Sequence, residues 1–316
     1  MKKRYLVLIL MIVSIISIFV GVQELSLTAL LQKDVDQIFI LLVSRIPRLM
    51  SLIVVGTGMS ICGLIMQLLT RNKFVSPTTA ATVDFAKLGM LIAMVFFAGA
   101  TMGQKIALAF VFSLFGTFLF MGLLKRMKFQ NALVIPLVGI MLGNVVGSIT
   151  TFIAYQSDLV QNISSWAVGN FTNVIKGNYE LLYLCIPLVI IAFLYASKFT
   201  IAGMGEDFST NLGLNHQTIV NIGLTIVSLI SAVIVVTIGT IPFIGIIIPN
   251  IVSIYAGDNL KNSLGHTALL GAIFLLVCDL FSRLIIYPYE VSISLTVGIV
   301  GSIIFLFLIM RRAKHA

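Results

Sequence analysis

The sequence has few charged residues for its length. Asp, Glu, Lys and Arg together make up 10% of the 316 residues, whereas 59% are hydrophobic. A soluble domain carries about 25% charged and roughly 45–50% apolar residues. This balance excludes an ordinary soluble protein and predicts a polytopic membrane protein. We expect one transmembrane domain over residues 1–316, with no soluble domain that could be separated from it.

Cysteine, histidine and catalytic motifs are also scarce. The three cysteines lie inside apolar runs with no paired spacing, which argues against a disulfide or metal framework. The chain lacks a phosphate-binding G-x-x-x-x-G-K-[ST] loop and the H-E-x-x-H and G-x-S-x-G motifs of hydrolases. We therefore expect no metal site, no cofactor, no catalytic residue and no ATPase site. The chain is predicted not to be an enzyme.

Long apolar runs dominate the chain and predict its fold. A helix needs about 20 apolar residues to cross a bilayer, and ten runs approach this length. The eighth run is short and contains Pro242 and Pro249, so we expect it to be broken or tilted. The fold class is therefore all-α, with about ten transmembrane helices. They are predicted near residues 5–23, 47–69, 78–98, 104–124, 131–154, 179–197, 217–238, 241–256, 266–286 and 292–310.

Basic residues predict the orientation. Lys and Arg exceed Asp and Glu by 20 − 11 = 9, an excess that in a membrane protein indicates orientation and not nucleic-acid binding. With the N-terminus inside, thirteen basic residues fall on the inner side and six on the outer side. We therefore expect a multi-pass protein of the cell membrane with both termini cytoplasmic. Arg45, Arg48 and Arg283 run against this bias. They either meet an outside partner, reach lipid phosphate, or pair locally, as Arg283 could with Asp279 or Glu290.

The polar segment between the sixth and seventh predicted helices reads as a short cytoplasmic helix. Gly205 can begin it, and Glu206 suits the positive end of the helix dipole. Phe208 and Leu212 are four residues apart and share one face, and Gly213 can end the helix in the left-handed conformation. Such a helix is suited to dock into a partner. The alternative is a loop lying on the lipid headgroups.

The fifth predicted helix carries a small and partly polar face. Gly139, Gly143 and Gly147 are four residues apart, with Asn144 beside them, so other backbones can approach closely. This spacing predicts either a helix that lines a pore or faces a dimer partner, or ordinary helix packing.

A pair of opposite charges opens the third predicted helix. Asp84 and Lys87 are three residues apart, and charges within a span are usually paired or functional. We expect a structural pair. Asp84 is also the one candidate for proton coupling, so a proton- or ion-coupled secondary transporter is the alternative function.

Several stretches of the chain resemble one family. They are Arg45-Ile46-Pro47-Arg48, residues 62–77, Trp166 to Phe171, Met204 to Leu214, Pro242 to Asn250 and Asp279 to Gly298. Together they are similar to the iron-siderophore and vitamin B12 ABC importer permeases of the FecCD type. The segment 71–79 is most similar to the branch that imports ferric catecholate-type siderophores such as petrobactin or anguibactin. Asn250 replaces the family's usual histidine, and Lys73 its usual proline, which argues against assigning vitamin B12 as cargo.

The resemblance implies a type II ABC importer permease and its partners. A homo- or heterodimer of permease subunits in the lipid bilayer surrounds the path. Two cytoplasmic ATPase subunits dock on the 205–213 segment, and a periplasmic or extracellular binding protein or lipoprotein delivers an iron-siderophore complex. Arg45, Arg48 and Arg283 match the arginines that face glutamates on the binding protein, and Asn72 and Phe74 match the inner gate.

Overall fold

The computed structural model describes residues 3–21, 26, 34–97, 99–127, 134–257 and 260–313. Within these residues the regular elements are helices, with one isolated β-bridge between Ile286 and Tyr289. This confirms the all-α fold class. The helices are α1 (Lys3–Phe19), α3 (Val35–Ile40), η1 (Leu41–Arg45), α4 (Ile46–Leu69), α5 (Thr82–Phe96), α6 (Met102–Arg126), α7 (Val134–Gln156), α8 (Val160–Ala167), η2 (Glu180–Leu184), α9 (Cys185–Leu194), α10 (Ala196–Met204), α11 (Glu206–Asn211), α12 (His216–Thr237), α13 (Ile244–Ala256), α14 (Leu260–Leu284) and α15 (Ile293–Ala313).

Nine of the ten predicted runs each coincide with one helix, although residues 22–23, 98 and 131–133 of the predictions lie outside the described part. The sixth, 179–197, is divided among η2, α9 and the start of α10. Five described helices are long and apolar enough to cross a membrane, or six if the pair 180–194 and 196–204, bent by 61°, forms one span. The second predicted helix, 47–69, is longer than predicted, because the helical stretch runs over Val35–Leu69. Its early start has a local cause, because the Asp34 side chain caps the helix by accepting from Asp36 N (3.0 Å).

α13 shows how a proline is accommodated inside a span. The helix begins at Ile244, after residue 243 in the left-handed conformation, and contains Pro249. Pro249 has no N–H, so the carbonyl four residues earlier, that of Gly245, loses its helical donor. Gln67 Nε2 of α4 donates to Gly245 O and to Ile246 O, at 3.3 Å each. The predicted break therefore falls before α13, and a neighbouring side chain replaces the lost donor.

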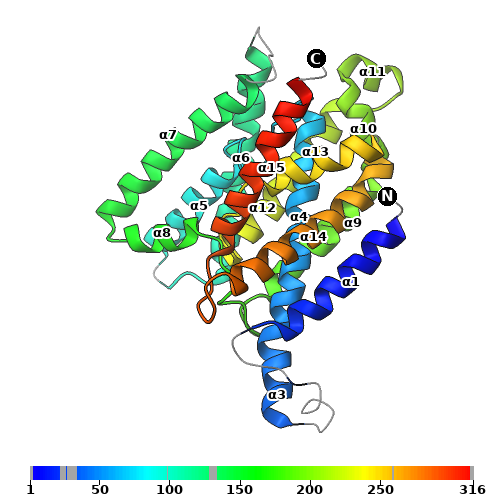
Figure 1. Ribbon diagram of the computed structural model, residues 1–316. Coiled ribbons are helices and arrows are strands. Elements are labelled where there is room, and N and C mark those ends of the chain that lie inside the picture. The colour runs from blue at the N-terminus through cyan, green and yellow to red at the C-terminus, as the bar shows by residue number, and fades with distance from the viewer. Residues whose placement is uncertain are drawn as a thin grey trace.

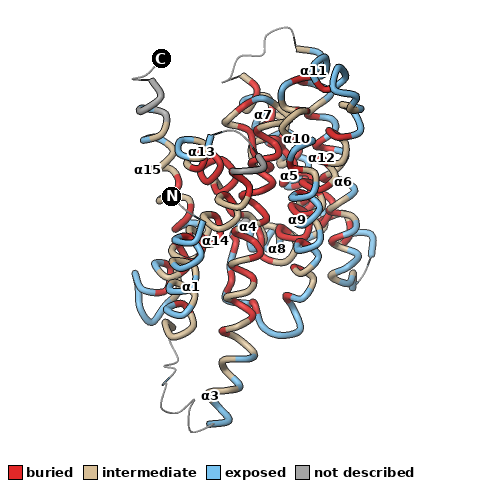
Figure 2. The backbone as a smooth tube through the Cα atoms, turned by 90° about the vertical axis from the view of Figure 1, so that its right-hand side faces the viewer, coloured by how far each residue is buried: buried red, intermediate tan, exposed pale blue. Residues whose placement is uncertain are grey.

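α4 is the central helix of the bundle, and it is buried over most of its length (Figures 1 and 2). Glycines allow its backbone to meet those of α13 and α14. A Cβ added at Gly63 would lie 1.9 Å from Gly245 O, and one at Gly56 would lie 2.6 Å from Gly271 O. Small residues at such crossings let membrane helices pack backbone to backbone. The crossings fix the positions of the elements that carry the candidate sites.

The bundle has two distinct ends and one open edge. α11 lies at one end and α3 at the other, and α7 runs along an edge from the α11 end toward the α3 end (Figure 1). α7 packs on α5, α6 and α8, and its other faces are exposed.

Candidate functional site

Three arginines meet two carboxylates at the α3 end. Arg48 Nη2 donates to Asp279 Oδ1 (2.8 Å), and Arg48 Nη1 donates to Glu290 Oε2 (2.8 Å). Arg283 pairs with the second oxygen of Asp279. We call Arg45, Arg48, Arg283, Asp279 and Glu290 the arginine cluster. It joins the end of η1 and the start of α4 to α14 and the loop before α15, which are far away in the sequence.

The same cluster also holds the end of α1. Arg283 Nη1 donates to Ser17 O (3.0 Å) and to Val20 O (2.8 Å), and Arg45 Nη1 donates to Val20 O (2.9 Å). The last carbonyls of a helix have no partner within it and carry partial negative charge, so cations are favourable there. The arginine cluster therefore both closes ion pairs and caps α1.

The arginines face into the protein in this conformation. Arg45 and Arg48 are 8% exposed, Arg283 is 3% exposed and Asp279 is fully buried. The local pairing of Arg283 with Asp279, left open from the sequence, is present, and Arg48 shares the same carboxylate. A partner's carboxylates would have to compete with Asp279 and Glu290. The docking role of these arginines therefore stays a prediction.

Glu290 lies in the loop between α14 and α15, where its charge is well supported. Burial alone would raise its pKa, but the ion pair with Arg48 and a hydrogen bond from Thr172 Oγ1 (3.0 Å) outweigh burial and lower the pKa of Glu290. The carboxylate is thus held ionised against the Arg48 guanidinium.

The opposite end carries the short helix α11. Gly205 has φ +126° and precedes Glu206, and Gly213 has φ +75° just after the helix, as the sequence predicted. Phe208 is 47% exposed and Leu212 is 55% exposed. Phe208 of α11 and Leu212, which follows the last residue of α11, are therefore two large apolar side chains open to a partner. The buried Ser209 Oγ donates to Gly205 O (2.6 Å) and fixes the turn that carries them.

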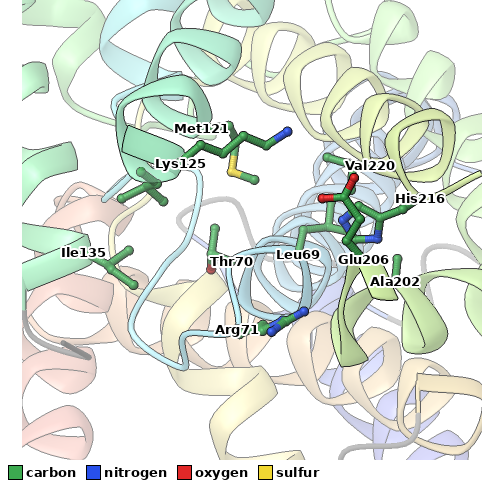
Figure 3. A pocket seen from close by; sticks show the side chains of 11 residues that line it. Leu69, Thr70, Arg71, Met121, Lys125, Ile135, Ala202, Glu206, His216 and Val220 are labelled. Atoms are coloured by element: carbon green, nitrogen blue, oxygen red, sulfur yellow. The ribbon is translucent and has the colours of Figure 1, made fainter. Parts of the chain in front are cut away.

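A cavity of about 220 Å³ lies beneath α11, with Arg71, Lys125, Glu206 and His216 in its walls. These side chains come from separate elements and gather around one space (Figure 3). Lys125 Nζ donates to Gln217 Oε1 (2.9 Å). The Arg71 guanidinium lies against the turn before α11, because a Cβ at Gly205 would be 2.1 Å from Arg71 Nη2. Through this contact of Arg71 with Gly205, the turn before α11 lies next to the end of α4.

Arg71 also begins the loop that holds the predicted gate residues. It has φ +51°, and Asn72 follows it with its side chain accepting from Phe74 N (2.8 Å). The Phe74 ring packs edge-on against Phe305 of α15, with ring centroids 5.9 Å apart. A gate formed by Phe74 would therefore move with α15 of the same chain.

The predicted glycines of α7 have three different surroundings. A Cβ at Gly139 would lie 2.0 Å from Thr79 O, so this position serves helix packing. A Cβ at Gly143 would lie 2.5 Å from Asp84 Oδ2, whereas Gly147 has nothing within 4 Å. Gly143, Asn144 and Gly147 line an open groove of about 740 Å³. We call it the α7 groove, and its other lining residues are Asp84, Ser148, Thr151, Phe152 and Tyr155.

Sequence reasoning missed two participants in these sites. The contact of Arg71 with the turn before α11 joins segments more than 130 residues apart, so no local sequence pattern could predict it. The position of Asp84 beside Gly143 was also missed, although its charge within a predicted span was a signal. Among the residues that the structure describes, no cluster of His, Cys, Asp and Glu suited to a metal ion was found.

These features define a class of protein. Membrane-length helices with a charged, polar groove along one of them are typical of a multi-pass membrane transport protein. The model of the FecCD transport family matches residues 9–311, nearly the whole chain. The chain therefore belongs to the FecCD transport family, as its motifs predicted.

Individual relatives agree with this family. The chain is 58% identical to the petrobactin import system permease protein YclN of Bacillus subtilis, over the full length of both. It is 37% identical to the ferric-anguibactin transport system permease protein FatD of Vibrio anguillarum, over 94% of this chain and 95% of the relative. A solved structure described as an inward-facing conformation of a metal-chelate type ABC transporter matches with a TM-score of 0.83, over 98% of each chain at 22% identity. The last match shows a shared fold.

Proposed function

We propose that this chain is the permease subunit of an ABC importer for iron-siderophore complexes, with both termini in the cytoplasm. The observation that carries the proposal is the 58% identity to a petrobactin permease over the full length of both chains. By that similarity the cargo is a ferric siderophore of the catecholate-containing type. The chain itself performs no chemistry, and separate ATPase subunits drive the transport.

A second permease subunit completes the path. The α7 groove is open along an edge of the bundle, and its wall contains Asp84 and Asn144. Charged and amide groups are costly against lipid chains, so this face requires a water-filled path or another subunit. A dimer that brings two such faces together encloses the path between them. The partner is another copy of this chain or a related permease.

α11 is the docking helix for the ATPase. Phe208 and Leu212 are half-exposed apolar side chains at the end proposed to be cytoplasmic. A displacement of α11 can reach the gate loop through one contact, because Arg71 lies against Gly205 and is followed by Asn72 and, two residues later, by Phe74. Closing of the ATPase dimer would thus move the gate loop.

The arginine cluster lies at the end proposed to face the binding protein. Arg48 and Arg283 pair with carboxylates of the chain itself, and Arg45 donates to Val20 O, so docking exchanges some of these contacts for carboxylates of the partner. Arginine suits such an exchange because its planar guanidinium binds a carboxylate in a two-pronged fork. Electrostatic contacts of this kind chiefly speed association and weaken with salt.

The alternative is a transporter driven by a proton or ion gradient, for which Asp84 is the candidate. Asp84 lies 3.6 Å from Lys87 Nζ, which supports a paired carboxylate and not a proton carrier. Uptake of a radioiron-labelled catecholate siderophore by cells separates the two functions. An ionophore that collapses the proton gradient while ATP is maintained should leave uptake intact. Loss of uptake under that condition would favour the gradient-driven transporter.

A further inference from the structure

The gate loop, residues 70–81 between α4 and α5, lies against α13. Asn250 Nδ2 of α13 donates to Lys73 O of the loop at 2.7 Å. A Cβ added at Gly245 would lie 3.3 Å from Ser76 Cβ, so the backbone of α13 also meets the loop directly. α13 therefore touches the gate loop at two points, one on each side of the predicted gate side chain at position 74.

A third contact between the gate loop and α13 runs through α15. The Phe305 ring of α15 packs against Phe74, and its centroid also lies 6.2 Å from that of Phe243, which directly precedes α13. Aromatic rings attract one another at centroid separations of about 4.5–7 Å. The predicted gate side chain and the start of α13 thus share one aromatic neighbour.

The contact made by Asn250 is both directed and buried. Asn250 is 4% exposed, and its amide has two N–H donors. They donate to Lys73 O and to Ile246 O, the carbonyl four residues earlier in α13, at 2.7 Å each. One side chain therefore bonds a carbonyl in the helix and a carbonyl in the gate loop, and joins the two elements.

We propose that Asn250 is a positioning residue of the inner gate, whose amide holds the gate loop on α13 so that the loop and α13 move as one body. This inference rests on the proposed function and names the helix that carries the gate. A shift of α13 reaches Phe74 through the bond to Lys73 O, while Arg71, at the start of the same loop, receives the motion of α11. Without the bond to Lys73 O, the loop leaves α13 and the gate opens without the ATPase.

Asn250→Ser isolates the bond to the gate loop. A serine hydroxyl in a helix can bond the carbonyl four residues back, as Ser302 Oγ does with Gly298 O (2.7 Å), so the bond to Ile246 O can be kept. The serine side chain is one atom shorter than that of Asn and falls short of Lys73 O. In proteoliposomes with the ATPase and the binding protein, Asn250→Ser should raise the ATP-independent efflux of an enclosed radioiron-labelled catecholate siderophore about five- to tenfold, the effect of a buried carbonyl left without its donor.

Gln67→Met is the matched control. Gln67 is likewise 4% exposed, and its amide donates to two carbonyls of α13, those of Gly245 and Ile246. Met has nearly the same shape without the N–H donors, so Gln67→Met should lower the Tm at least as much as Asn250→Ser does. Only Asn250→Ser should raise the efflux. Equal efflux from the two variants would show that Asn250 serves packing alone, and would overturn the proposal.

Phe74→Ala tests whether Asn250 acts through the gate. In that background Asn250→Ser should add little efflux, because the side chain that closes the path is already missing. If the two substitutions instead multiply their effects, Asn250 acts elsewhere and the proposal is wrong. Asn250→Asp gives a second reading should the serine variant fold poorly, since it keeps the size of Asn and, when ionised, has no N–H donor. It should raise efflux in the same way, and wild-type efflux from it would contradict the proposal.

The unmodified complex separates this inference from the proposed function. If it shows ATP-driven uptake and Asn250→Ser has the same efflux as the unmodified complex, only the positioning role of Asn250 is wrong. If the unmodified complex shows no ATP-driven uptake, the proposed function fails, and the positioning role fails with it. Uptake by the unmodified complex together with raised efflux from Asn250→Ser alone, and not from Gln67→Met, is the result that the proposal predicts.

Discussion

Replacing Asp279 by Asn should destabilise the protein strongly. Asp279 is fully buried, and its two oxygens pair with Arg48 and Arg283. Removing one partner of a buried ion pair costs about 3–5 kcal/mol, because a charge is left uncompensated. We expect the lower end, about 3 kcal/mol by the same measure, since Arg48 keeps Glu290 and Arg283 keeps Ser17 and Val20. At roughly 2–4 °C per kcal/mol for a large domain, the Tm should fall by about 6–12 °C.

The three cysteines provide the assay. Cys62, Cys185 and Cys278 are free and buried, so a thiol-reactive dye should report unfolding in detergent. Asp158→Asn is the control, because Asp158 is exposed and its left-handed φ of +56° is compatible with Asn. If Asp279→Asn melts within a degree or so of the control, the arginine cluster does not stabilise the fold as argued.

The remaining predictions address coupling, gating, pH and docking. Leu212→Asp should abolish co-purification with the ATPase, because a charge enters an apolar contact at a cost of a few kcal/mol; a retained complex with full transport would contradict it. Phe74→Ala should raise the leak of reconstituted vesicles or uncoupled ATP hydrolysis, and an unchanged leak would count against a gate there. The lowered pKa of Glu290 stabilises the fold above the unfolded-state value of about 4.3 and the gain disappears as pH falls through the lower folded-state pKa. The Tm should therefore drop in acid, and less so in Glu290→Gln; identical acid profiles would refute this. Arg45→Glu should slow association with the binding protein at low salt. Arg45 is the better position for this test, because a charge reversal at Arg48 would also break its pairs with Asp279 and Glu290. An unchanged association rate would favour a purely structural role for Arg45.

Much of the fold could be predicted from the sequence, because the length and apolarity of a run report directly on a membrane span. The continuation of the second helix back to Val35 could not, since it depends on a cap by Asp34 within a stretch of mixed polarity. The break before α13 could be predicted from Pro242 and Pro249. The compensating donor, Gln67, could not, because it comes from another helix.

The candidate sites were predictable only in part. The four-residue spacing of Gly139, Gly143 and Gly147 gave no means to tell them apart, yet one meets a backbone, one meets Asp84 and one faces open space. The pairing of Asp279 with Arg283 follows from helical spacing. Its pairing with Arg48, 231 residues away, depends on the crossing of α4 and α14. The local turns at α11 were more predictable, because Gly205 and Gly213 can adopt the positive φ that these turns require.

Uptake by the reconstituted complex tests the central claim most directly. The permease, with its ATPase and binding protein, would be placed in proteoliposomes and supplied with a radioiron-labelled catecholate siderophore. The account predicts uptake that requires ATP on the ATPase side, requires the binding protein on the other side, persists when an ionophore removes every ion gradient, and is lost with Leu212→Asp. Uptake that follows an imposed proton gradient and proceeds without the ATPase would contradict it.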